Sequence, residues 1–356
     1  MSCLDSALGR KRDLADLEAL GEECELSGLG RHLPNPHLLI APYVRREAVL
    51  SSRIEGTKTN LADLLLEEVE AGASEQAESE VREVRNYVVA LDHGIRMLAK
   101  PPLSLRLVRE IHERLMKGVR GDSATPGEFR QSQNWIGTPD STPATATYVP
   151  PPEQMMEALS DWERFLHIRD RIPDLIQCAL MHEQFEAIHP FLDGNGRIGR
   201  LLITLFLIER GRLSQPLLYL SAYFEAHRQD YYDLLQRVRT HGDWHGWIRF
   251  FLAGVAETAR EGVRRASRLM GLRERFQKRL RERPKALALL DHLFLNPYMS
   301  VARAERVLKV SNPTARQVVR VLEQKGMLEE ITGRSWGRLY LARPILEAIE
   351  GSPEAP

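Results

Sequence analysis

One short stretch of the chain, from His189 to Arg200, gathers residue types that together can handle a phosphate and a proton. It reads HPFLDGNGRIGR, follows a segment with apolar residues at helical spacing, and precedes another, LLITLFLIERG. The glycines therefore fall at the start of a helix, where backbone N–H groups lack intrahelical partners and the helix dipole favours an anion. We expect Gly194, Asn195 and Gly196 to form an anion-binding nest.

The charged side chains of this stretch suit a polyphosphate and a hydroxyl group. Arg197 falls next to the nest and Arg200 follows one turn later, so both guanidinium groups can face the same anion. Asp193 supplies a hard oxygen ligand, and Mg²⁺ is usually held by one or two carboxylates together with phosphate and water. His189 stands where an imidazole could take a proton from an incoming hydroxyl.

Other interpretations of the same letters fit less well. GNGRIG satisfies the GxGxxG pattern, but a helix and a proline turn precede it where a dinucleotide-binding fold needs a strand. DGNGRI begins like a calcium loop, but Thr204 stands where that loop needs glutamate. HEQFE is one letter from the zinc motif HExxH, yet Pro190 ends the helix near His189, the third candidate ligand, so we expect His182 and Glu186 to orient the loop by hydrogen bonds. No Walker A or protein-kinase motif is present in the sequence.

The composition is that of an ordinary globular protein. Hydrophobic residues make up 43% and charged residues 28% of the 356 positions, and 49 Lys and Arg balance 49 Asp and Glu, so bulk charge predicts no polyanion partner. Cys3, Cys24 and Cys178 are widely spaced and match no metal pattern, which fits a reducing compartment. The apolar runs are too short to cross a bilayer and the N-terminus lacks an apolar signal core, so we expect a cytoplasmic protein with no membrane partner.

Three regions are expected around the loop, and the predicted fold class is mainly α. Residues 1–80 form an N-terminal region that is rich in loops up to about residue 45 and helical after it. Residues 81–265 show apolar residues at helical spacing in one segment after another, which is typical of a helical bundle. One interruption, Gln133–Pro152, has β-branched and aromatic residues around a Gly/Pro/Ser/Thr tip and predicts a hairpin or flap.

A distinct tail, residues 284–345, follows a long helix. KALALLDHLFLN, SVARAERVL and SNPTARQVVRVLEQKG predict three helices, and MLEEI and GRLYLA predict two short strands around TGRSWGR. This order resembles a winged helix, which can place its last helix in a DNA groove. Contacts could come from Arg316, Gln317, Arg320, Arg334 and Arg338. A winged helix serves protein contacts or dimerisation equally well, so DNA binding stays open.

The loop also resembles the defining motif of the Fic family, HxFx[DE]GNGRxxR. Every fixed position matches, through His189, Phe191, Asp193, Gly194, Asn195, Gly196, Arg197 and Arg200. RGDSATPGEFRQSQNWIG, YVPPP, FEAIHPF, PLLYLS and the pair Tyr231 and Tyr232 are similar to segments of large bacterial Fic proteins with an added N-terminal region and a C-terminal winged helix. The resemblance implies a Fic-type helical bundle.

The resemblance also implies an activity, since Fic enzymes mostly move AMP from ATP to a hydroxyl of a target protein and release pyrophosphate. The target would carry a Ser, Thr or Tyr hydroxyl and could be the chain itself, and a homodimer is left open. The implied roles are His189 as general base, Asp193 as Mg²⁺ ligand, Asn195 with the Gly194 and Gly196 amides on the α-phosphate, Arg197 and Arg200 on the outer phosphates, and Tyr231 beside the adenosine. The stretch from Ile136 and Gly137 through Tyr148 would clamp the target by backbone pairing.

SSRIEG, residues 51 to 56, resembles the inhibitory motif of the family, [ST]xxxE[GN], through Ser51, Glu55 and Gly56. Ser51 and Glu55 are four residues apart and share a helix face. The resemblance implies that Glu55 pairs with Arg200 and turns away the γ-phosphate. Two alternatives remain: the same loop could remove AMP, with Glu55 orienting a water, or the chain could be a DNA-binding regulator that senses nucleotide. An intact His189 favours catalysis over sensing.

Overall fold

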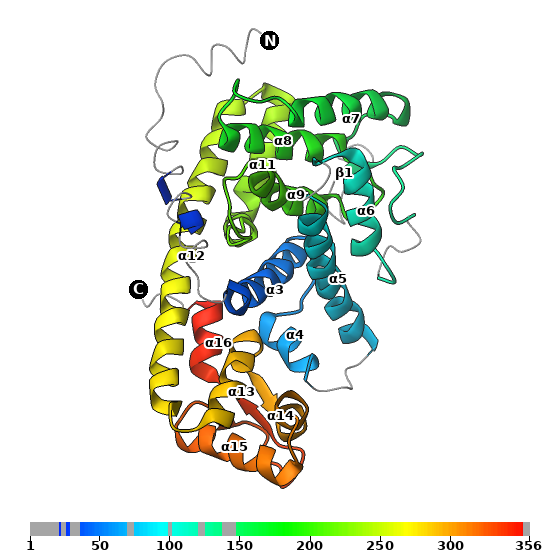
Figure 1. Ribbon diagram of the computed structural model, residues 1–356. Coiled ribbons are helices and arrows are strands. Elements are labelled where there is room, and N and C mark those ends of the chain that lie inside the picture. Colours follow the sequence, from blue (N-terminus) through cyan, green and yellow to red (C-terminus); the bar gives the residue numbers. More distant parts are fainter. Residues whose placement is uncertain are drawn as a thin grey trace.

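The protein is described here by a computed structural model, which is predominantly helical and confirms the mainly α class (Figure 1). It describes residues 21–22, 26–28, 36–69, 75–98, 102–119, 125–136 and 147–351. Within these ranges, two small antiparallel sheets accompany the helices. None of the helices in the described ranges combines the length and the apolar character that crossing a membrane requires.

The N-terminal region is built on helix α3, Pro36–Ile54, followed by the short helix α4, Leu61–Glu67. The expectation of loops is wrong for residues 36–45, because α3 starts at Pro36 and continues through Pro42. Most of the earlier positions in that expectation lie outside the described residues. Pro36 suits the first turn, where its missing N–H leaves no bond unmade. Pro42 removes one hydrogen bond inside the helix. The helix nevertheless continues and buries the apolar side chains that follow, including Tyr43 and Val44.

The central bundle surrounds an antiparallel pair of helices, α8 and α9, which carry the loop between them. Most side chains of both helices are buried, so their apolar residues run around the whole helix instead of along one stripe. The 37-residue helix α12 runs along one side of the molecule and connects the bundle to the C-terminal part (Figure 1). The bundle helices are α5 Glu75–Met97, α6 Leu105–Leu115, α7 Pro152–Leu166, α8 Asp174–Ile188, α9 Asn195–Glu209, α10 Ser221–Ala226, α11 Arg228–His241 and α12 Trp244–Leu280.

The predicted flap contains two short strands, β1 Trp135–Ile136 and β2 Thr147–Tyr148, which pair in antiparallel register. Ile136 is half-buried in β1. Tyr148 pairs through its backbone with Trp135. Gly137, the third flap residue that the sequence singles out, lies outside the described residues.

The C-terminal part contains three helices and two strands in the predicted order, together with two elements that the sequence did not predict. Strand β3 pairs with β5, and β5 also pairs with β4, both antiparallel. The added elements are β3, which completes a three-stranded sheet, and α16, which ends the described chain. The elements are α13 Pro284–Leu295, β3 Tyr298–Ser300, α14 Val301–Leu308, α15 Asn312–Gln324, β4 Glu329–Glu330, β5 Leu339–Leu341 and α16 Arg343–Glu350.

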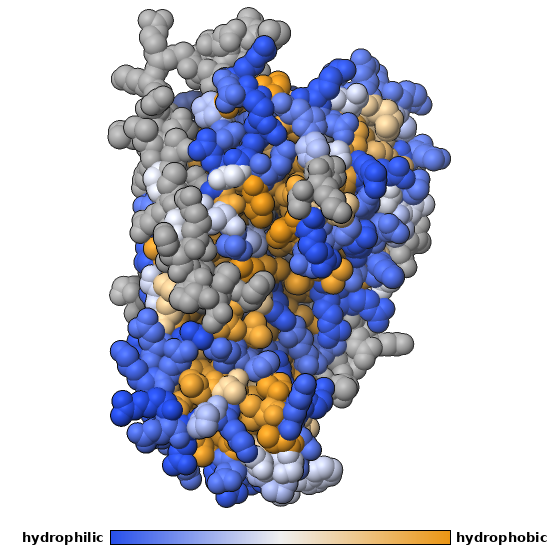
Figure 2. Space-filling model, in the orientation of Figure 1, coloured by the Kyte–Doolittle hydropathy of each residue, from blue (hydrophilic) through white to orange (hydrophobic). Residues whose placement is uncertain are grey.

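Helix α3 lies in the middle of the molecule, between the central bundle and the C-terminal part (Figure 1). The buried Asn296, after α13, donates from Nδ2 to the Leu65 carbonyl (2.9 Å) and to Glu68 Oε2 (3.0 Å). Arg45 on α3 donates to the other Glu68 oxygen at 2.8 Å. On the face drawn in Figure 2, hydrophilic residues cover most of the rim and the visible hydrophobic residues gather along the middle.

Candidate active site

The stretch from His189 to Gly194 forms a tight loop between α8 and α9. His189 and Gly194, at its two ends, have left-handed backbone angles, with φ of 51° and 79°. The buried Asn195 side chain closes the loop: Oδ1 accepts from the Phe191 N–H and Nδ2 donates to the Phe191 carbonyl, both at 2.8 Å. The Asn195 amide is thus engaged within the loop, and the backbone N–H groups in the first turn of α9 remain available for an anion.

His112 on α6 packs against the loop and bonds to its backbone. Sequence reasoning missed this residue. Its ring stacks on Phe191, with 3.7 Å between ring centroids. Nδ1 accepts from the Gly127 N–H at 2.8 Å, which leaves Nε2 to donate to the Asp193 carbonyl at 3.0 Å. Burial lowers the pKa of His112 to about 4, so the ring is neutral at pH 7 and both hydrogen bonds persist. In the sequence, His112 is one polar residue within an otherwise ordinary helical pattern.

The first arginine of the loop is buried beside the nest. Arg197 Nη1 lies 3.4 Å from Glu83 Oε2, and Nη2 lies 3.7 Å from Asp193 Oδ1. Glu83, on α5, was not predicted. The Asp193 carboxylate is half exposed and also accepts from the Gly194 N–H at 2.6 Å. About half of its side-chain surface therefore remains accessible to a ligand.

The second arginine is held by Ser51 and Glu55 of the SSRIEG segment. Arg200 Nη2 donates to Glu55 Oε1 at 2.6 Å, and Nε donates to Ser51 Oγ at 2.9 Å. Arg200 Nη2 also donates to the Ser51 carbonyl at 2.9 Å. Burial alone would raise the pKa of Glu55, but the charge and hydrogen bond of Arg200 hold that pKa below its usual value. Three contacts thus occupy the guanidinium group, although only one of them goes to the carboxylate.

Glu55 lies directly over the nest. A Cβ atom added to Gly196 would come within 2.2 Å of Glu55 Oε1, so the side chain can lie here only because residue 196 is glycine. Gly56 follows Glu55 and has a left-handed φ of +99°, which ends the turn after α3. The carboxylate of Glu55 therefore occupies space that an anion on the nest would need.

His189 has the protonation state that a general base requires. Burial, together with the positive charge of Arg239, lowers its pKa to about 4. The negative charge of Glu55 opposes that shift in part. The half-buried imidazole is consequently neutral near pH 7 and can accept a proton.

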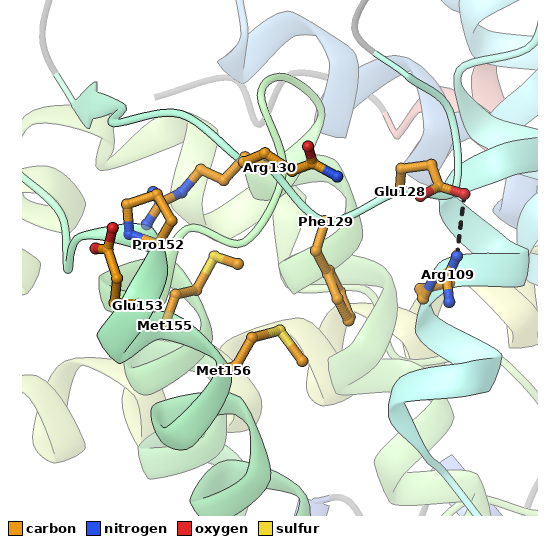
Figure 3. A pocket seen from close by; sticks show the side chains of 9 residues that line it. Arg109, Glu128, Phe129, Arg130, Pro152, Glu153, Met155 and Met156 are labelled. Carbon is orange, nitrogen blue, oxygen red and sulfur yellow. Dashed lines mark hydrogen bonds and ion pairs between the residues drawn. The ribbon is translucent and has the colours of Figure 1, made fainter.

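A third residue that sequence reasoning missed, Arg130, fixes the His189 backbone. Arg130 is buried and donates from Nε to the His189 carbonyl at 2.9 Å. It lies in the TPGEFR segment, just before the flap. Arg130 also lines an open pocket of about 480 Å³ beside the base of the flap, where its side chain extends toward Pro152 and away from the Arg109–Glu128 ion pair (Figure 3).

The structure buries Tyr231 and exposes its neighbour. Tyr231 is 1% exposed, stacks on Phe224, and its hydroxyl lies 2.9 Å from His182 Nε2. His182 therefore supports the core next to the loop. Tyr232 is 37% exposed and lies close enough to Glu55 and Arg200 for their charges to act on its hydroxyl. An adenosine contact by Tyr231 stays a prediction, and Tyr232 is the tyrosine of the pair with accessible surface.

The residues at the loop fit a magnesium ion that is held mainly by a nucleotide. No three His, Cys, Asp or Glu side chains of the described ranges gather closely enough to hold a metal by themselves. Asp193 supplies one half-exposed carboxylate beside a nest for phosphate. Mg²⁺ typically takes one or two carboxylates and completes its shell with phosphate oxygens and water.

The first turn of a helix, two arginines, a half-exposed carboxylate and a neutral histidine meet at one loop within a helical bundle. The model named Fic/DOC family N-terminal matches residues 18–96, and the Fic/DOC family model matches residues 102–207. The chain therefore belongs to the Fic/DOC family.

Curated relatives with this domain are named as adenylyltransferases. Protein adenylyltransferase Fic from Aedes aegypti is 32% identical over 151 residues, 42% of this chain and 27% of that protein. The protein of the same name from Nematostella vectensis is 28% identical over 179 residues, 46% of this chain and 36% of that protein. The similarity thus spans about a third of each relative's length or less.

Solved structures share the fold. A Fic family protein from Desulfovibrio desulfuricans G20 superposes with a TM-score of 0.60 over 94% of this chain and 97% of that chain, at 20% identity. Fic-1 (residues 134–508) from C. elegans has a TM-score of 0.51 over 76% of this chain and 75% of that chain, at 25% identity. The first of these extends the similarity in fold to nearly the whole chain.

Proposed function

We propose that this protein is a protein adenylyltransferase that moves AMP from ATP to a Ser, Thr or Tyr hydroxyl and is autoinhibited by Glu55. The observation that carries the proposal is the position of Arg200, whose guanidinium is held by Glu55 beside the phosphate nest of α9. A guanidinium group in this position can bind an anion, as the nest can. Glu55 is its present partner, and a phosphate is the chemically similar alternative.

In the proposed reaction the nest amides hold the α-phosphate while Arg197 and Arg200 hold the outer phosphates. Asp193 would hold Mg²⁺, which neutralises charge on the phosphate oxygens. The target hydroxyl forms a bond to the α-phosphorus, and the bond from that phosphorus to the oxygen of the departing pyrophosphate breaks. The neutral His189 accepts the hydroxyl proton. Preorganised amides and guanidinium groups then stabilise the charge that develops on the phosphate.

Autoinhibition follows from the competition for Arg200. While the Glu55 carboxylate is bound to its guanidinium group, a γ-phosphate cannot be held there. Without that contact the triphosphate binds with its α-phosphate out of line with the attacking hydroxyl, so transfer is slowed more than binding.

Intact mass spectrometry after incubation with ATP and Mg²⁺ tests the proposal. The Glu55→Gly variant should gain AMP on its own hydroxyls, wild type should gain less, and Glu55→Gly with His189→Ala should gain none. Equal AMP incorporation by wild type and Glu55→Gly would refute autoinhibition by Glu55. If wild type instead strips AMP from a modified protein and Glu55→Gly loses that ability, the loop removes AMP and Glu55 is part of that reaction.

A second function, DNA binding, is favoured by the surface of the C-terminal part, whose helices and hairpin we interpret as a winged helix. Arg316, Gln317 and Arg320 are all exposed on α15, and Trp336 is 85% exposed between β4 and β5. If these arginines contact phosphates, affinity for duplex DNA falls steeply as salt is added. Gel-shift assays at a series of salt concentrations measure this affinity. The double variant Arg316→Ala/Arg320→Ala serves as the control and should bind more weakly. Absence of binding at low salt would assign this surface to protein contacts.

A further inference from the structure

The buried Arg130 joins two parts of the site that the chain keeps far apart. It precedes the flap, and its contacts lie at the flap base and at the end of α8. Nη1 donates to the Ser132 carbonyl at 3.0 Å and Nη2 donates to the Pro150 carbonyl at 2.5 Å. Ser132 precedes β1 and Pro150 follows β2, so one guanidinium group holds both strands of the flap at their base.

The same side chain holds the backbone of the proposed general base. Arg130 Nε donates to the His189 carbonyl at 2.9 Å, and Nη2 lies 3.4 Å from the Ile188 carbonyl. The Arg130 backbone N–H also donates to the Pro190 carbonyl at 2.9 Å. His189 has left-handed angles, φ of 51° and ψ of 61°, which a residue with a side chain adopts only when its surroundings hold it.

Arg130 is unusual among the buried arginines of the site in its partners. Within the described ranges it forms no ion pair, whereas Arg197 and Arg200 each face a carboxylate. Its charge instead meets carbonyl oxygens, including those at the C-terminal end of α8, where the helix dipole is negative. A planar group with five donors can serve four carbonyls at once, and a lysine ammonium group cannot reproduce that arrangement.

We infer that Arg130 is a positioning residue that couples the target-binding flap to the catalytic histidine, by holding the carbonyls of Ser132, Pro150 and His189 with one guanidinium group. The inference rests on the proposed function, because it assigns the flap to target binding and His189 to proton transfer. It adds a physical link between them: a flap displaced by a target moves the same side chain that orients His189.

Arg210 provides a matched control at the opposite end of the α8–α9 pair. Its side chain is also buried, and Nη2 donates to the Leu166 and Ile168 carbonyls and to Gln177 Oε1, each at 2.8 Å. Unlike Arg130 it also has an ion-pair partner, Asp174, at 3.5 Å. None of these contacts is to the loop or the flap, so replacing Arg210 should cost stability without disturbing the site.

The experiment compares Arg130→Ala, Arg130→Lys and Arg210→Ala in the Glu55→Gly background. The rate of AMP incorporation is measured against ATP concentration, and thermal stability is measured in parallel. Arg130→Ala should lower the maximal rate by about tenfold to a hundredfold, since misplacement by about 1 Å can cost that much. The ATP concentration for half-maximal rate should change little. Arg130→Lys should remain impaired, and Arg210→Ala should keep the parent rate.

Chemical rescue separates positioning from general stability. Added guanidinium, at concentrations far below those that unfold the protein, should restore part of the rate of Arg130→Ala, because it can refill the vacated space. It should not change the rate of Arg210→Ala. Methylammonium at equal ionic strength should fail to rescue, since it lacks the planar fork. A parent rate in Arg130→Ala, or a loss that matches Arg210→Ala and resists rescue, would overturn the inference.

Amide hydrogen exchange tests the coupling without relying on activity. In Arg130→Ala, exchange should speed up together in the segment before β1 and in the loop that follows α8, and guanidinium should slow both. Faster exchange in one segment alone would overturn the coupling. If Glu55→Gly takes up no AMP while both segments respond together, the proposed function fails and the coupling holds.

Discussion

Arg200 is the residue on which the proposed regulation depends, because it can serve a carboxylate or a phosphate with the same donors. In the structure it has three hydrogen bonds, one to Glu55 and two to Ser51. The contacts to Ser51 keep the guanidinium group in place when the carboxylate leaves. We therefore expect release of Glu55 to leave Arg200 already oriented for a γ-phosphate.

A double-mutant cycle on this pair gives a direct prediction. Glu55→Gly should raise AMP incorporation more than it raises ATP affinity, because the freed guanidinium aligns the bound triphosphate. Adding Arg200→Ala should cancel that gain, since the residue that Glu55 restrains is then missing, and the two effects should be strongly non-additive. Incorporation and ATP binding are measured for wild type, both single variants and the double variant. Independent, additive effects would contradict the competition for Arg200.

The pKa of His189 predicts how transfer depends on pH. With a pKa of about 4, the imidazole stays neutral down to about pH 5 and becomes protonated below it. The transfer rate of Glu55→Gly should therefore be flat through neutral pH and fall only in acid, with stability measured at each pH as a control. His189→Ala should keep ATP binding and lose transfer at every pH. A decline centred near the ordinary histidine value, about pH 6.5, would contradict this assignment.

At the scale of elements, α3 carries a buried carboxylate, Glu47, one helical turn before Ser51. Glu47 Oε1 accepts from Tyr87 on α5 at 3.1 Å and from Ser221 on α10 at 2.5 Å. Burial raises the pKa of Glu47 to about 7, against the opposing effects of the Ser221 hydrogen bond and the Arg200 charge. These bonds join α3 to α5 and α10.

Glu47→Gln should change the pH dependence of stability in a defined direction. The raised pKa means that the folded protein keeps a proton that the unfolded chain loses, so wild type loses stability from this group as pH rises from about 4.5 to 7. The variant lacks that loss, and its stability relative to wild type should improve by about 3 kcal/mol across this range. Urea unfolding at several pH values measures the difference, in which the other buried acids cancel. A difference that is constant with pH would contradict the prediction.

The sequence predicted what is encoded locally. HPFLDGNGRIGR specifies the loop between α8 and α9, and SSRIEG specifies the end of α3, because each consists of neighbouring residues with a defined spacing. The pairing of Glu55 with Arg200 was expected only through the family resemblance. Other pairings between distant segments could not be predicted, since no local pattern shows that His112 meets Phe191 or that Arg130 meets His189. The start of α3 was missed for a related reason: Pro42 ordinarily indicates a break, and only packing in the folded chain outweighs it.

At the scale of the whole molecule, the C-terminal part and helix α4 share a buried junction. Asn296 joins the two through Leu65 and Glu68, and its Oδ1 accepts from the Tyr298 N–H at 2.9 Å. Asn296→Ala should lower the free energy of unfolding by about 2 to 4 kcal/mol, because buried polar groups lose their partners. Asn312→Ala, at an exposed position on α15, should change it by less than about 0.5 kcal/mol. Equal effects in urea unfolding would show that the junction contributes little.

The measurement that tests the central claim most directly is the fate of the two ends of ATP. Glu55→Gly is incubated with Mg²⁺ and ATP labelled on either the α- or the γ-phosphate, and label on the protein is counted. AMP transfer attaches the α-phosphate and releases the γ-phosphate within pyrophosphate, so only the α-label should become protein-bound, and His189→Ala should abolish it. Incorporation of the γ-label would show phosphate transfer instead, and incorporation of neither label would contradict the account.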